Sequence, residues 1–471
     1  MLIDPPGFNG LRINRILGSF GTYKSDQVWP PYDLQIMAGY LNKEGHEFKI
    51  LDANSLNLGY KEVFIEIKKY KPDWVIFLTC FPNFKLDAKV AEIAKKIDKK
   101  IKTACMSLSI LSIEDPKKQM EELPYLDFIP WGEPEIPLME LINDKNPTEV
   151  SGLYYRDKGI IKFSRGIATR AKNLDIFGQP IHSSIPYKIY RCPQAVSSPM
   201  TIVTCSRGCI NMCTHCPSIF QKPLRYRSIK NILKELDEIK SLGIREIKFY
   251  DCALLNNVDF TKKLCQEMIK REYKFTWHCN SRAESIDDNI LKLMKRAGCH
   301  TIAIGCESAD AEILKNMKKN ETPEQIEMAV KLVKKHGMRV LMYLTFGLEG
   351  ETEETMKKTF NFAKRLNPEL VTFGIVVPNP KTIFYNYLNK NGWLINKNLE
   401  LRDPNNLPAF AYPHLSPEKI HKFTRLAYKE YYLRLAYILM RLKDLRSFTE
   451  LKTLFTNALS VLKRYQFEKV Q

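Results

Sequence analysis

Strand-like runs alternate with amphipathic helical runs from residue 200 onward, and this alternation most constrains the fold. The strand-like runs cover residues 200–204, 246–250, 275–279, 301–305, 340–346 and 370–377, and the helical runs cover residues 229–242, 260–271, 287–297, 323–336 and 353–366. Gly243, Gly298 and Gly337 fall where helical runs should end. Repeated strand–helix units with short connections predict a partial (β/α)6 TIM-like barrel over residues 200–385, with its chemistry at the carboxyl ends of the strands.

A second α/β pattern occupies residues 1–144. Short apolar strands at 2–3, 47–51, 74–78 and 102–106 alternate with helical segments, which predicts a doubly wound parallel sheet. A ligand of such a sheet binds beyond the carboxyl ends of the strands. The loops at those ends are residues 4–8, 79–84, 105–109 and 132–133.

The remaining segments are less regular. Residues 145–199 contain several prolines and are interpreted as a linker, whereas residues 386–471 form a helical C-terminal region. Within that region, residues 431–442 interleave Tyr, Leu, Ile and Met with Arg434 and Arg441. Such a helix either packs on the rim of the barrel or lies on a membrane surface, where it would admit a lipid substrate.

Composition narrows the cellular setting. No apolar run approaches the roughly 18 residues of a membrane span, and the first residues show no secretory signal, so a cytoplasmic location is expected. In that reducing compartment the 12 cysteines are expected to be free, metal-bound or catalytic. The net charge of +19 comes from lysines spread along the helical runs, which favours a solvated surface over a nucleic-acid site.

The run from Thr204 to Pro217 contains Cys209, Cys213 and Cys216 in CxxxCxxC spacing, directly after the first barrel strand. Three thiolates on one short loop can each bind a different iron of a cubane cluster and leave the fourth iron open for chemistry. The alternative is a zinc site, which needs four ligands and could take the fourth from Cys205 or His215. The position at the active-site face of a barrel favours the iron–sulfur cluster.

This cysteine run resembles the motif of the radical S-adenosylmethionine (SAM) superfamily. The resemblance implies that the open iron of a 4Fe-4S cluster is chelated by the amino and carboxylate groups of SAM. One-electron reduction then cleaves SAM to methionine and a 5′-deoxyadenosyl radical, which abstracts hydrogen from the substrate. The family usually has an aromatic residue before the last cysteine, and this chain has His215 there.

The resemblance extends to the ends of the later strands. It implies SAM contacts by Asp251 after the second strand, by Ser281 and Arg282 after the third, by Gly305 and Glu307 in a Gly-Cys-Glu-Ser segment after the fourth, and by Gly347 after the fifth. No single one of these is distinctive, because an acidic residue at a strand end is often solvated or caps a helix.

Residues 1–144 resemble the cobalamin-binding domain that precedes many radical SAM cores. The matching features are Asp4-Pro5-Pro6, Asp52-Ala53 and Gly132-Glu133, and the implied cobalamin contacts are Pro5, Pro6, Thr79, Cys105 and Glu133. Two features depart from that pattern. The DxHxxG motif of cobalamin mutases is absent, and Ala104-Cys105-Met106 stands where relatives often have Gly-Gly-Pro. The second departure leaves open whether the cofactor is held.

The two resemblances together imply a cobalamin-dependent radical SAM enzyme that methylates an unactivated carbon. A radical cyclase or oxidase of the same architecture is the first alternative. An RNA-modifying radical SAM enzyme without cobalamin is the second, although only Cys80 and Cys105 lie in the first domain, where methylthiotransferases carry three cluster ligands. A non-catalytic carrier is disfavoured by the intact cysteine triad. The expected partners are a small-molecule or lipid substrate and a one-electron donor such as ferredoxin or flavodoxin; nucleic acid is not expected, and peripheral membrane contact stays open.

Overall fold

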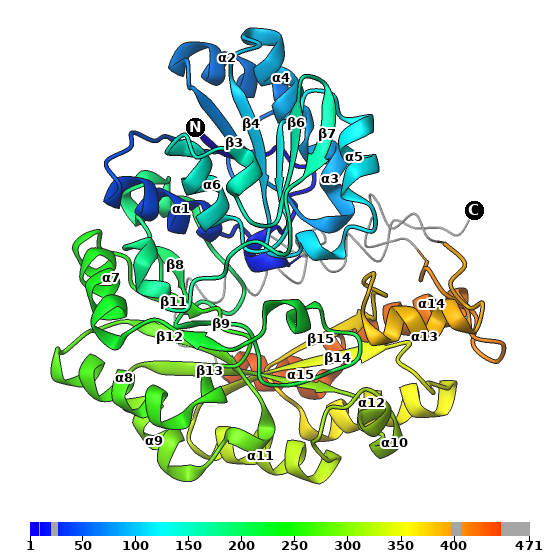
Figure 1. The fold of residues 1–471 in the computed structure, drawn as a ribbon. Coiled ribbons are helices and arrows are strands. Elements are labelled where there is room, and N and C mark those ends of the chain that lie inside the picture. Colours follow the sequence, from blue (N-terminus) through cyan, green and yellow to red (C-terminus); the bar gives the residue numbers. More distant parts are fainter. Residues whose placement is uncertain (9, 20–26, 397–406, 444–471) are drawn as a thin grey trace.

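The computed structural model describes residues 1–8, 10–19, 27–396 and 407–443. Parts of the predicted C-terminal region, residues 397–406 and 444–471, therefore lie outside the described residues. The chain forms two α/β parts, the first (blue to cyan) above the second (green to orange) in Figure 1.

The first part is built on a seven-stranded sheet with the order β2-β1-β3-β4-β5-β6-β7. Its strands are β1 (Leu2–Asp4), β2 (Ile50–Asp52), β3 (Trp74–Leu78), β4 (Lys102–Met106), β5 (Phe128–Pro130), β6 (Leu153–Asp157) and β7 (Ile160–Phe163). The first five run parallel, and their apolar side chains are buried on both faces, as expected for a doubly wound sheet.

Helices cover both faces of this sheet. The helices are α1 (Tyr32–Lys43), α2 (Tyr60–Tyr70), α3 (Phe84–Asp87), α4 (Lys89–Ile97), α5 (Pro116–Glu122) and α6 (Glu135–Ile142). Met37 of α1 and Leu138 of α6 share one apolar core, whereas Val63 of α2, Ala91 of α4 and Met120 of α5 share another. The predicted doubly wound fold is confirmed.

The sheet continues into the range that the sequence suggests is a linker. Strands β6 and β7 form a hairpin, and β6 pairs antiparallel with β5 through Tyr155 opposite Phe128. The prolines of residues 145–199 lie outside these two strands, which connect at Lys158 and Gly159, both with positive φ. A two-residue turn of this kind matches the twist of a hairpin, so the first domain extends to Phe163.

The second part is built on a six-stranded parallel sheet with the order β15-β14-β13-β12-β11-β8. Its strands are β8 (Met200–Val203), β11 (Glu246–Phe249), β12 (Thr276–Ser281), β13 (Cys299–Glu307), β14 (Arg339–Phe346) and β15 (Leu370–Ile375). Its helices are α7 (Ile229–Ser241), α8 (Val258–Lys270), α9 (Asp288–Arg296), α10 (Ala311–Asn316), α11 (Pro323–Lys335) and α12 (Glu353–Leu366). Strands β8 and β15 do not pair among the described residues, so the barrel is partial.

The two faces of the barrel sheet differ in character. Ile247, Trp277 and Ile302 point toward the surrounding helices and belong to one large apolar core. The alternate residues, among them Lys248 and Asn280, face the interior, where Lys248 Nζ donates to Asn280 Oδ1 at 2.8 Å. The interior face therefore carries polar side chains beside apolar ones such as Met200 and Ile202, which pair with Glu246 and Lys248 of β11.

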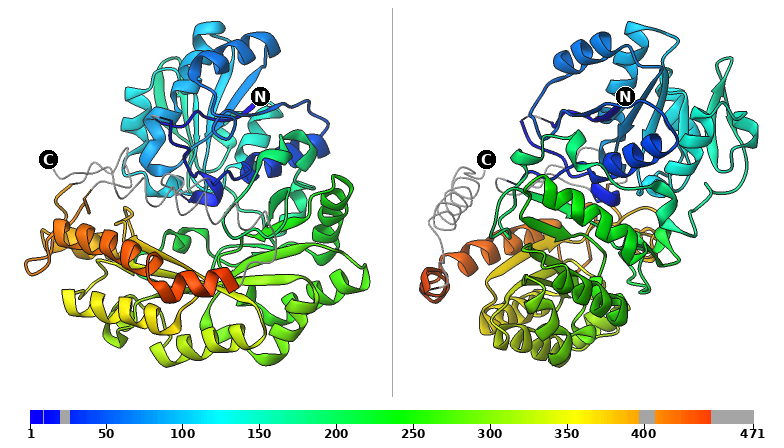
Figure 2. Two further views of the ribbon diagram at one scale, coloured as in Figure 1. Left: turned by 180° about the vertical axis from the view of Figure 1, so that it is seen from behind. Right: turned by 90° about the vertical axis from the view of Figure 1, so that its left-hand side faces the viewer.

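The C-terminal helices cover the free edge of the barrel sheet. They are α13 (Ile383–Lys390), α14 (Pro417–Tyr432) and α15 (Leu435–Lys443), and Figure 2 shows α14 and α15 running across the outside of the barrel. The N–H groups of Val371 and Phe373 in β15 donate to the hydroxyls of Tyr432 and Tyr428 at 2.9 and 3.1 Å. These contacts place the region on the barrel, in agreement with the rim-packing interpretation.

None of the helices within the described residues is long and apolar enough to cross a membrane.

Candidate functional site

The cysteine loop begins at the carboxyl end of β8, on the side of the barrel that faces the first domain (Figure 1). Its two ends are joined by a short antiparallel pair, β9 (Ser206–Arg207) with β10 (Arg225–Tyr226). Gly208 has a φ of 95°, and a Cβ there would lie 2.7 Å from the carbonyl oxygen of Gln221. Glycine is thus required where the chain turns into the loop.

Cys209, Cys213 and Cys216 lie on this loop as free thiols and are partly exposed, whereas Cys205 is fully buried. The three thiols are close enough to interact electrostatically. Cys216 interacts with Cys209, and Cys213 interacts with Cys216. Burial raises the pKa of the Cys213 thiol, and the charge of Lys319 opposes that rise. The backbone and side-chain amides of Asn211 donate to Cys209 Sγ at 3.4 and 3.6 Å, a donor set suited to a metal-bound thiolate.

The spacing of the three sulfurs separates the two metals that the sequence left open. Among the described residues, these sulfurs do not form a group within 4.8 Å of one another. A single zinc ion with bonds of about 2.3 Å would hold its thiolates closer than that. Cys205, the possible fourth zinc ligand, has Asp251, Arg227 and Glu235 as its main electrostatic neighbours instead of the triad. The loop therefore fits a larger cluster better than a zinc ion.

Backbone hydrogen bonds from distant parts of the chain hold the loop in place. The N–H of Thr214 donates to the carbonyl of Met317 after α10, and the N–H of Phe384 in α13 donates to the carbonyl of Thr214, both at 3.0 Å. Between these anchors, the Nδ1 atom of His215 is buried with no hydrogen-bond partner in the part of the chain that the structure describes. A ring nitrogen left in that state can accept or donate to a bound molecule.

Charged groups from two strand ends and from the segment after α10 lie around Cys213. Lys319, Arg282 and Glu307 all contribute to its electrostatic environment. Glu307 ends β13 with a φ of 63° and accepts a hydrogen bond from Thr345 Oγ1 at 2.6 Å. A cation and a carboxylate beside the cysteine loop are suited to the carboxylate and ammonium of an amino acid.

Lys319 was not found from the sequence. It is buried, and its Nζ lies 3.2 Å from Glu321, which also lies 3.5 Å from Arg282. It follows a short helix in a run of lysines and has no strand-end position that would single it out. Only the fold brings it to the cysteine loop.

The remaining residues implied to bind SAM lie at the expected strand ends and already contact neighbouring residues of the chain. Asp251 uses its carboxylate to accept from the N–H of Cys205 at 3.1 Å and from Ser206 Oγ at 2.5 Å. Ser281 donates to the carbonyl of Arg282, and Gly347 is packed against Phe410. Gly305 lies next to Glu307, where a Cβ would meet Glu307 Oε1 at 2.8 Å. Asp251 thus braces the start of the cysteine loop.

At the carboxyl edge of the first sheet, Arg15 is fully buried and organises the side chains around it. Its guanidinium donates to Asp4 at 2.8 Å, to Asp87 at 2.5 Å and to the carbonyls of Pro5 and Pro6. Thr79 donates to the same Asp87 at 2.8 Å. The structure therefore engages Pro5, Pro6 and Thr79 in a network within the domain.

Two polar atoms at this edge have no partner. Arg12 Nε, in the loop after β1, and Ser112 Oγ, beyond β4, are buried without a hydrogen bond among the described residues. Cys105 is fully buried in the apolar core of β4. The unpartnered donors mark where a polar ligand such as the amides of cobalamin could bind, whereas burial raises the pKa of Cys105 and keeps it a thiol.

Glu133 connects the two domains. Its carboxylate pairs with Arg225 of β10, and Arg207 of β9 pairs with Glu135 of α6; all four side chains are buried. Burial opposes ionisation of Glu133, but the hydrogen bond from Arg225 and the charges of Arg207 and Arg225 lower its pKa. The pair of strands β9 and β10, which carries the cysteine loop, is thus fixed to the first domain.

Comparison with known proteins agrees with this geometry. Residues 203–363 match the family model of the radical SAM superfamily. The chain is 29% identical over 446 residues to a protein of Pyrococcus horikoshii named as an uncharacterised methyltransferase, covering 92% of both chains. It is 26% identical over 371 residues to the anaerobic magnesium-protoporphyrin IX monomethyl ester cyclase of Rubrivivax gelatinosus; the match covers 75% of this chain and 65% of that relative, less than two thirds of its length.

Solved structures share the fold. The cobalamin-dependent SAM radical enzyme OxsB with aqua-cobalamin bound gives a TM-score of 0.70 at 17% identity, covering 98% of this chain and 71% of OxsB. The radical SAM methyltransferase TsrM from Kitasatospora setae, with cobalamin and a 4Fe-4S cluster bound, gives 0.64 at 16% identity, covering 83% of this chain and 74% of TsrM. The family match shows that residues 203–363 form a radical SAM domain, and the solved structures show that the fold of the two parts is shared.

Proposed function

We propose that this enzyme is a cobalamin-dependent radical SAM methyltransferase that methylates an unactivated carbon of a small-molecule or lipid substrate. The observation that carries the proposal is the position of the cysteine loop. It lies at the carboxyl end of the barrel sheet and is joined by buried ion pairs to the first domain, whose own fold is of the doubly wound type. A cofactor held by each domain would therefore face the same interdomain space.

The chain's own residues have distinct tasks in this proposal. Cys209, Cys213 and Cys216 hold the 4Fe-4S cluster, while Lys319 and Glu307 bind the carboxylate and ammonium of SAM beside Cys213. When bound, the cluster and SAM supply a carbon-centred radical, and cobalamin supplies the methyl group. In this proposal Asp251 keeps the loop entrance in place, because both of its oxygens accept hydrogen bonds from residues 205 and 206.

The first domain would hold cobalamin mainly by its loops. Arg12 and Ser112 offer unpartnered donors on the loops after β1 and β4. Pro5, Pro6 and Thr79 shape the same edge through the Arg15 network, and Glu133 fixes the domain to the β9–β10 pair. The names of the Pyrococcus relative and of TsrM support methyl transfer, and the cobalamin named for TsrM and OxsB supports that cofactor.

A radical cyclase of the same architecture is the second candidate, and the similarity to the magnesium-protoporphyrin cyclase favours it. Both candidates use the same activation of SAM. They differ in whether S-adenosylhomocysteine accumulates, because methyl transfer from SAM through cobalamin produces it and cyclisation does not.

The experiment is anaerobic purification, reconstitution with iron, sulfide and cobalamin, and reduction in the presence of SAM by a one-electron donor such as flavodoxin. We expect about one cobalt per chain, a broad visible band from the cluster, and release of both 5′-deoxyadenosine and S-adenosylhomocysteine once the substrate is supplied. Protein with a cluster but without cobalt would reject methyl transfer through cobalamin and retain the radical SAM assignment. 5′-Deoxyadenosine without S-adenosylhomocysteine on a turned-over substrate would favour the cyclase.

A further inference from the structure

A second group of metal-ligating side chains lies at the other end of the barrel sheet. Glu246 is the first residue of β11, His278 lies near the start of β12, and His300 near the start of β13. These strands are neighbours and run parallel, so their amino ends meet at one edge, opposite the cysteine loop. None of the three belongs to the site described above.

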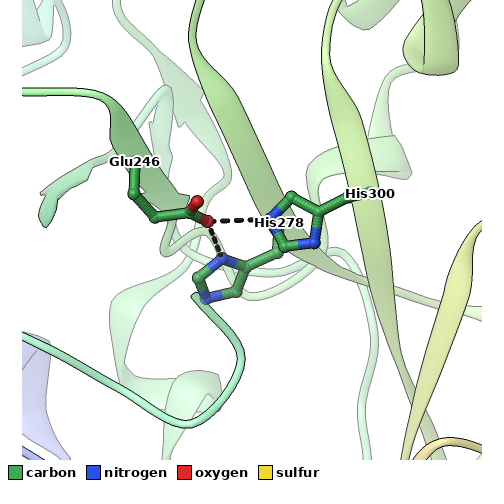
Figure 3. Close-up of side chains that lie close together, drawn as sticks. All are labelled: Glu246, His278 and His300. Carbon is green, nitrogen blue, oxygen red and sulfur yellow. Dashed lines mark hydrogen bonds and ion pairs between the residues drawn. The ribbon is translucent and has the colours of Figure 1, made fainter. Parts of the chain in front are cut away.

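The three side chains converge on one point. Glu246 Oε1 lies 3.0 Å from His278 Nδ1 and 2.8 Å from His300 Nε2 (Figure 3). One ligand atom from each of the three side chains lies within 4.8 Å of the other two. Among the described residues, no other set of three or more His, Cys, Asp or Glu side chains meets this condition. Both imidazoles are thus aimed at a single carboxylate oxygen from two adjacent strands.

Surrounding groups fix the orientation of each candidate ligand. Glu246 Oε2 accepts from the N–H groups of Val196 and Ser197 and, at 2.5 Å, from Thr276 Oγ1. The other ring nitrogen of His300 lies 2.8 Å from Thr301 Oγ1, and that of His278 lies 3.8 Å from Cys192 Sγ. Such outer partners hold the rings and carboxylates of metal sites in position and set the tautomer of each histidine.

Two imidazoles, and not a lysine or arginine in the described residues, stabilise the negative charge of Glu246. Glu246 is fully buried, and in the described part of the chain its carboxylate has no lysine or arginine partner. The direct partners of this buried carboxylate are two imidazoles and neutral donors, so no permanent positive charge is in contact with it, although Lys248 of the same strand acts electrostatically on His278. A divalent cation between the three ligand atoms supplies that charge.

We propose that Glu246, His278 and His300 bind a divalent transition-metal ion of the zinc class. Two imidazole nitrogens and one carboxylate oxygen are a common set of three protein ligands for such an ion. Metal–ligand bonds of about 2.0–2.2 Å would require only a small separation of atoms that now lie 2.8–3.0 Å apart. Water fills the fourth position, and His300, with 11% of its side chain exposed, lies on the path from solvent.

Binding exchanges the proton positions on the rings. His278 Nδ1 and His300 Nε2 become ligands, and the protons move to the nitrogens that face Cys192 and Thr301. The ion joins β11, β12 and β13 to residues 196–197 at the amino end of the barrel sheet. It shares no ligand with the cysteine loop.

The test uses the reconstituted, iron-loaded full chain, dialysed against zinc and analysed for zinc and iron by mass spectrometry. We expect about one zinc per chain in the wild type, loss of that zinc in His300→Gln, and unchanged iron in that variant. Cys213→Ser is the matched control and should lose iron while keeping zinc. X-ray absorption at the zinc edge should show nitrogen and oxygen ligands near 2.0–2.1 Å and no sulfur near 2.3 Å.

Thr301→Val guards against misfolding of the histidine variant, because it removes only the hydroxyl partner of His300. We expect it to weaken zinc binding by about 10–100-fold while leaving the iron content unchanged. Zinc content in the wild type no higher than in His300→Gln overturns the proposal and leaves a hydrogen-bonded triad. Zinc with sulfur ligands, or zinc lost in Cys213→Ser, overturns it as well, because the ion would then lie on the cysteine loop.

Discussion

The two large sheets of this molecule differ in how the polar groups at their carboxyl edges are paired. At the carboxyl edge of the first sheet, Arg15 binds Asp4 and Asp87 inside the domain. At the carboxyl edge of the barrel sheet, the three thiols are partly exposed, and His215 Nδ1 is buried without a partner among the residues that the structure describes. Apart from Arg12 Nε and Ser112 Oγ, which lack a hydrogen bond among the described residues, the first edge is closed by an internal ion-pair network, whereas the second leaves its ligand atoms available. The difference shows that a cofactor site is better recognised by unmet ligand atoms than by strand-end residues alone.

The largest expected effect comes from removing a ligand at the open edge. Cys213→Ala should lose the iron and the brown colour of the cluster, and cleavage of SAM should fall below detection. The reason is that a cubane held by two thiolates is not retained. Iron analysis and 5′-deoxyadenosine assays measure this. Cys205→Ala is the control, because this buried cysteine of the same run should be dispensable. A Cys213→Ala enzyme that keeps both iron and activity would refute the assignment of the triad.

The closed edge should respond in stability instead. Arg15→Met leaves two buried carboxylates without their cation, which typically costs about 3–5 kcal/mol. The control is Lys49→Met, which breaks the more exposed ion pair with Glu66 and should cost at most about 1 kcal/mol. Chemical denaturation of both variants and the wild type measures the two losses in the free energy of unfolding. Equal losses in the two variants would mean that the Arg15 network is not what holds this edge together.

The connection between the edges should depend on pH. The pKa of Glu133 is lowered in the folded protein by Arg225 and Arg207, although burial opposes this, so ionised Glu133 stabilises the fold above its ordinary pKa of about 4.3. That contribution is lost as the pH falls through the lowered folded pKa. Glu133→Gln should cost about 2 kcal/mol at pH 7 and progressively less below pH 4. Thermal unfolding across this range checks it, and a cost independent of pH would contradict the ion-pair role.

The smallest effect concerns Asp251. Asp251→Asn keeps one acceptor oxygen but weakens the bonds to Cys205 and Ser206, so we expect a loss of about 1 kcal/mol with little change in KM for SAM. Unfolding curves and steady-state kinetics separate the two roles. A tenfold rise in KM at unchanged stability would show that Asp251 contacts SAM, as the family resemblance implies.

Features that depend on local sequence patterns could be predicted from the sequence. The cysteine triad, both α/β parts and the partial barrel follow from local spacing and from hydrophobic periodicity, which act over a few residues. The strand-end positions of Asp251, Arg282 and Glu307 were also accessible, since each follows a strand-like run. The direction of their side chains could not be predicted from the sequence. It depends on hydrogen bonds between separate strands, from the N–H of Cys205 to Asp251 and from Thr345 Oγ1 to Glu307.

Other features depended wholly on long-range contacts. The hairpin of β6 and β7 lies among prolines that suggest a linker, and its pairing with β5 is a tertiary choice. Lys319 becomes a neighbour of Cys213 only when the segment after α10 folds back. Glu246, His278 and His300 lie on three strands far apart in the sequence, so no motif announces them.

The anchoring of Thr214 has a consequence for assembly. Its N–H and carbonyl are held by Met317 and Phe384, residues made long after the cysteines on the ribosome. Such distant contacts form late, because the intervening chain must first be ordered. The cysteine loop therefore has its final shape only when nearly the whole barrel is folded. We expect a nascent chain ending before α13 to remain colourless under conditions that load iron into the finished protein.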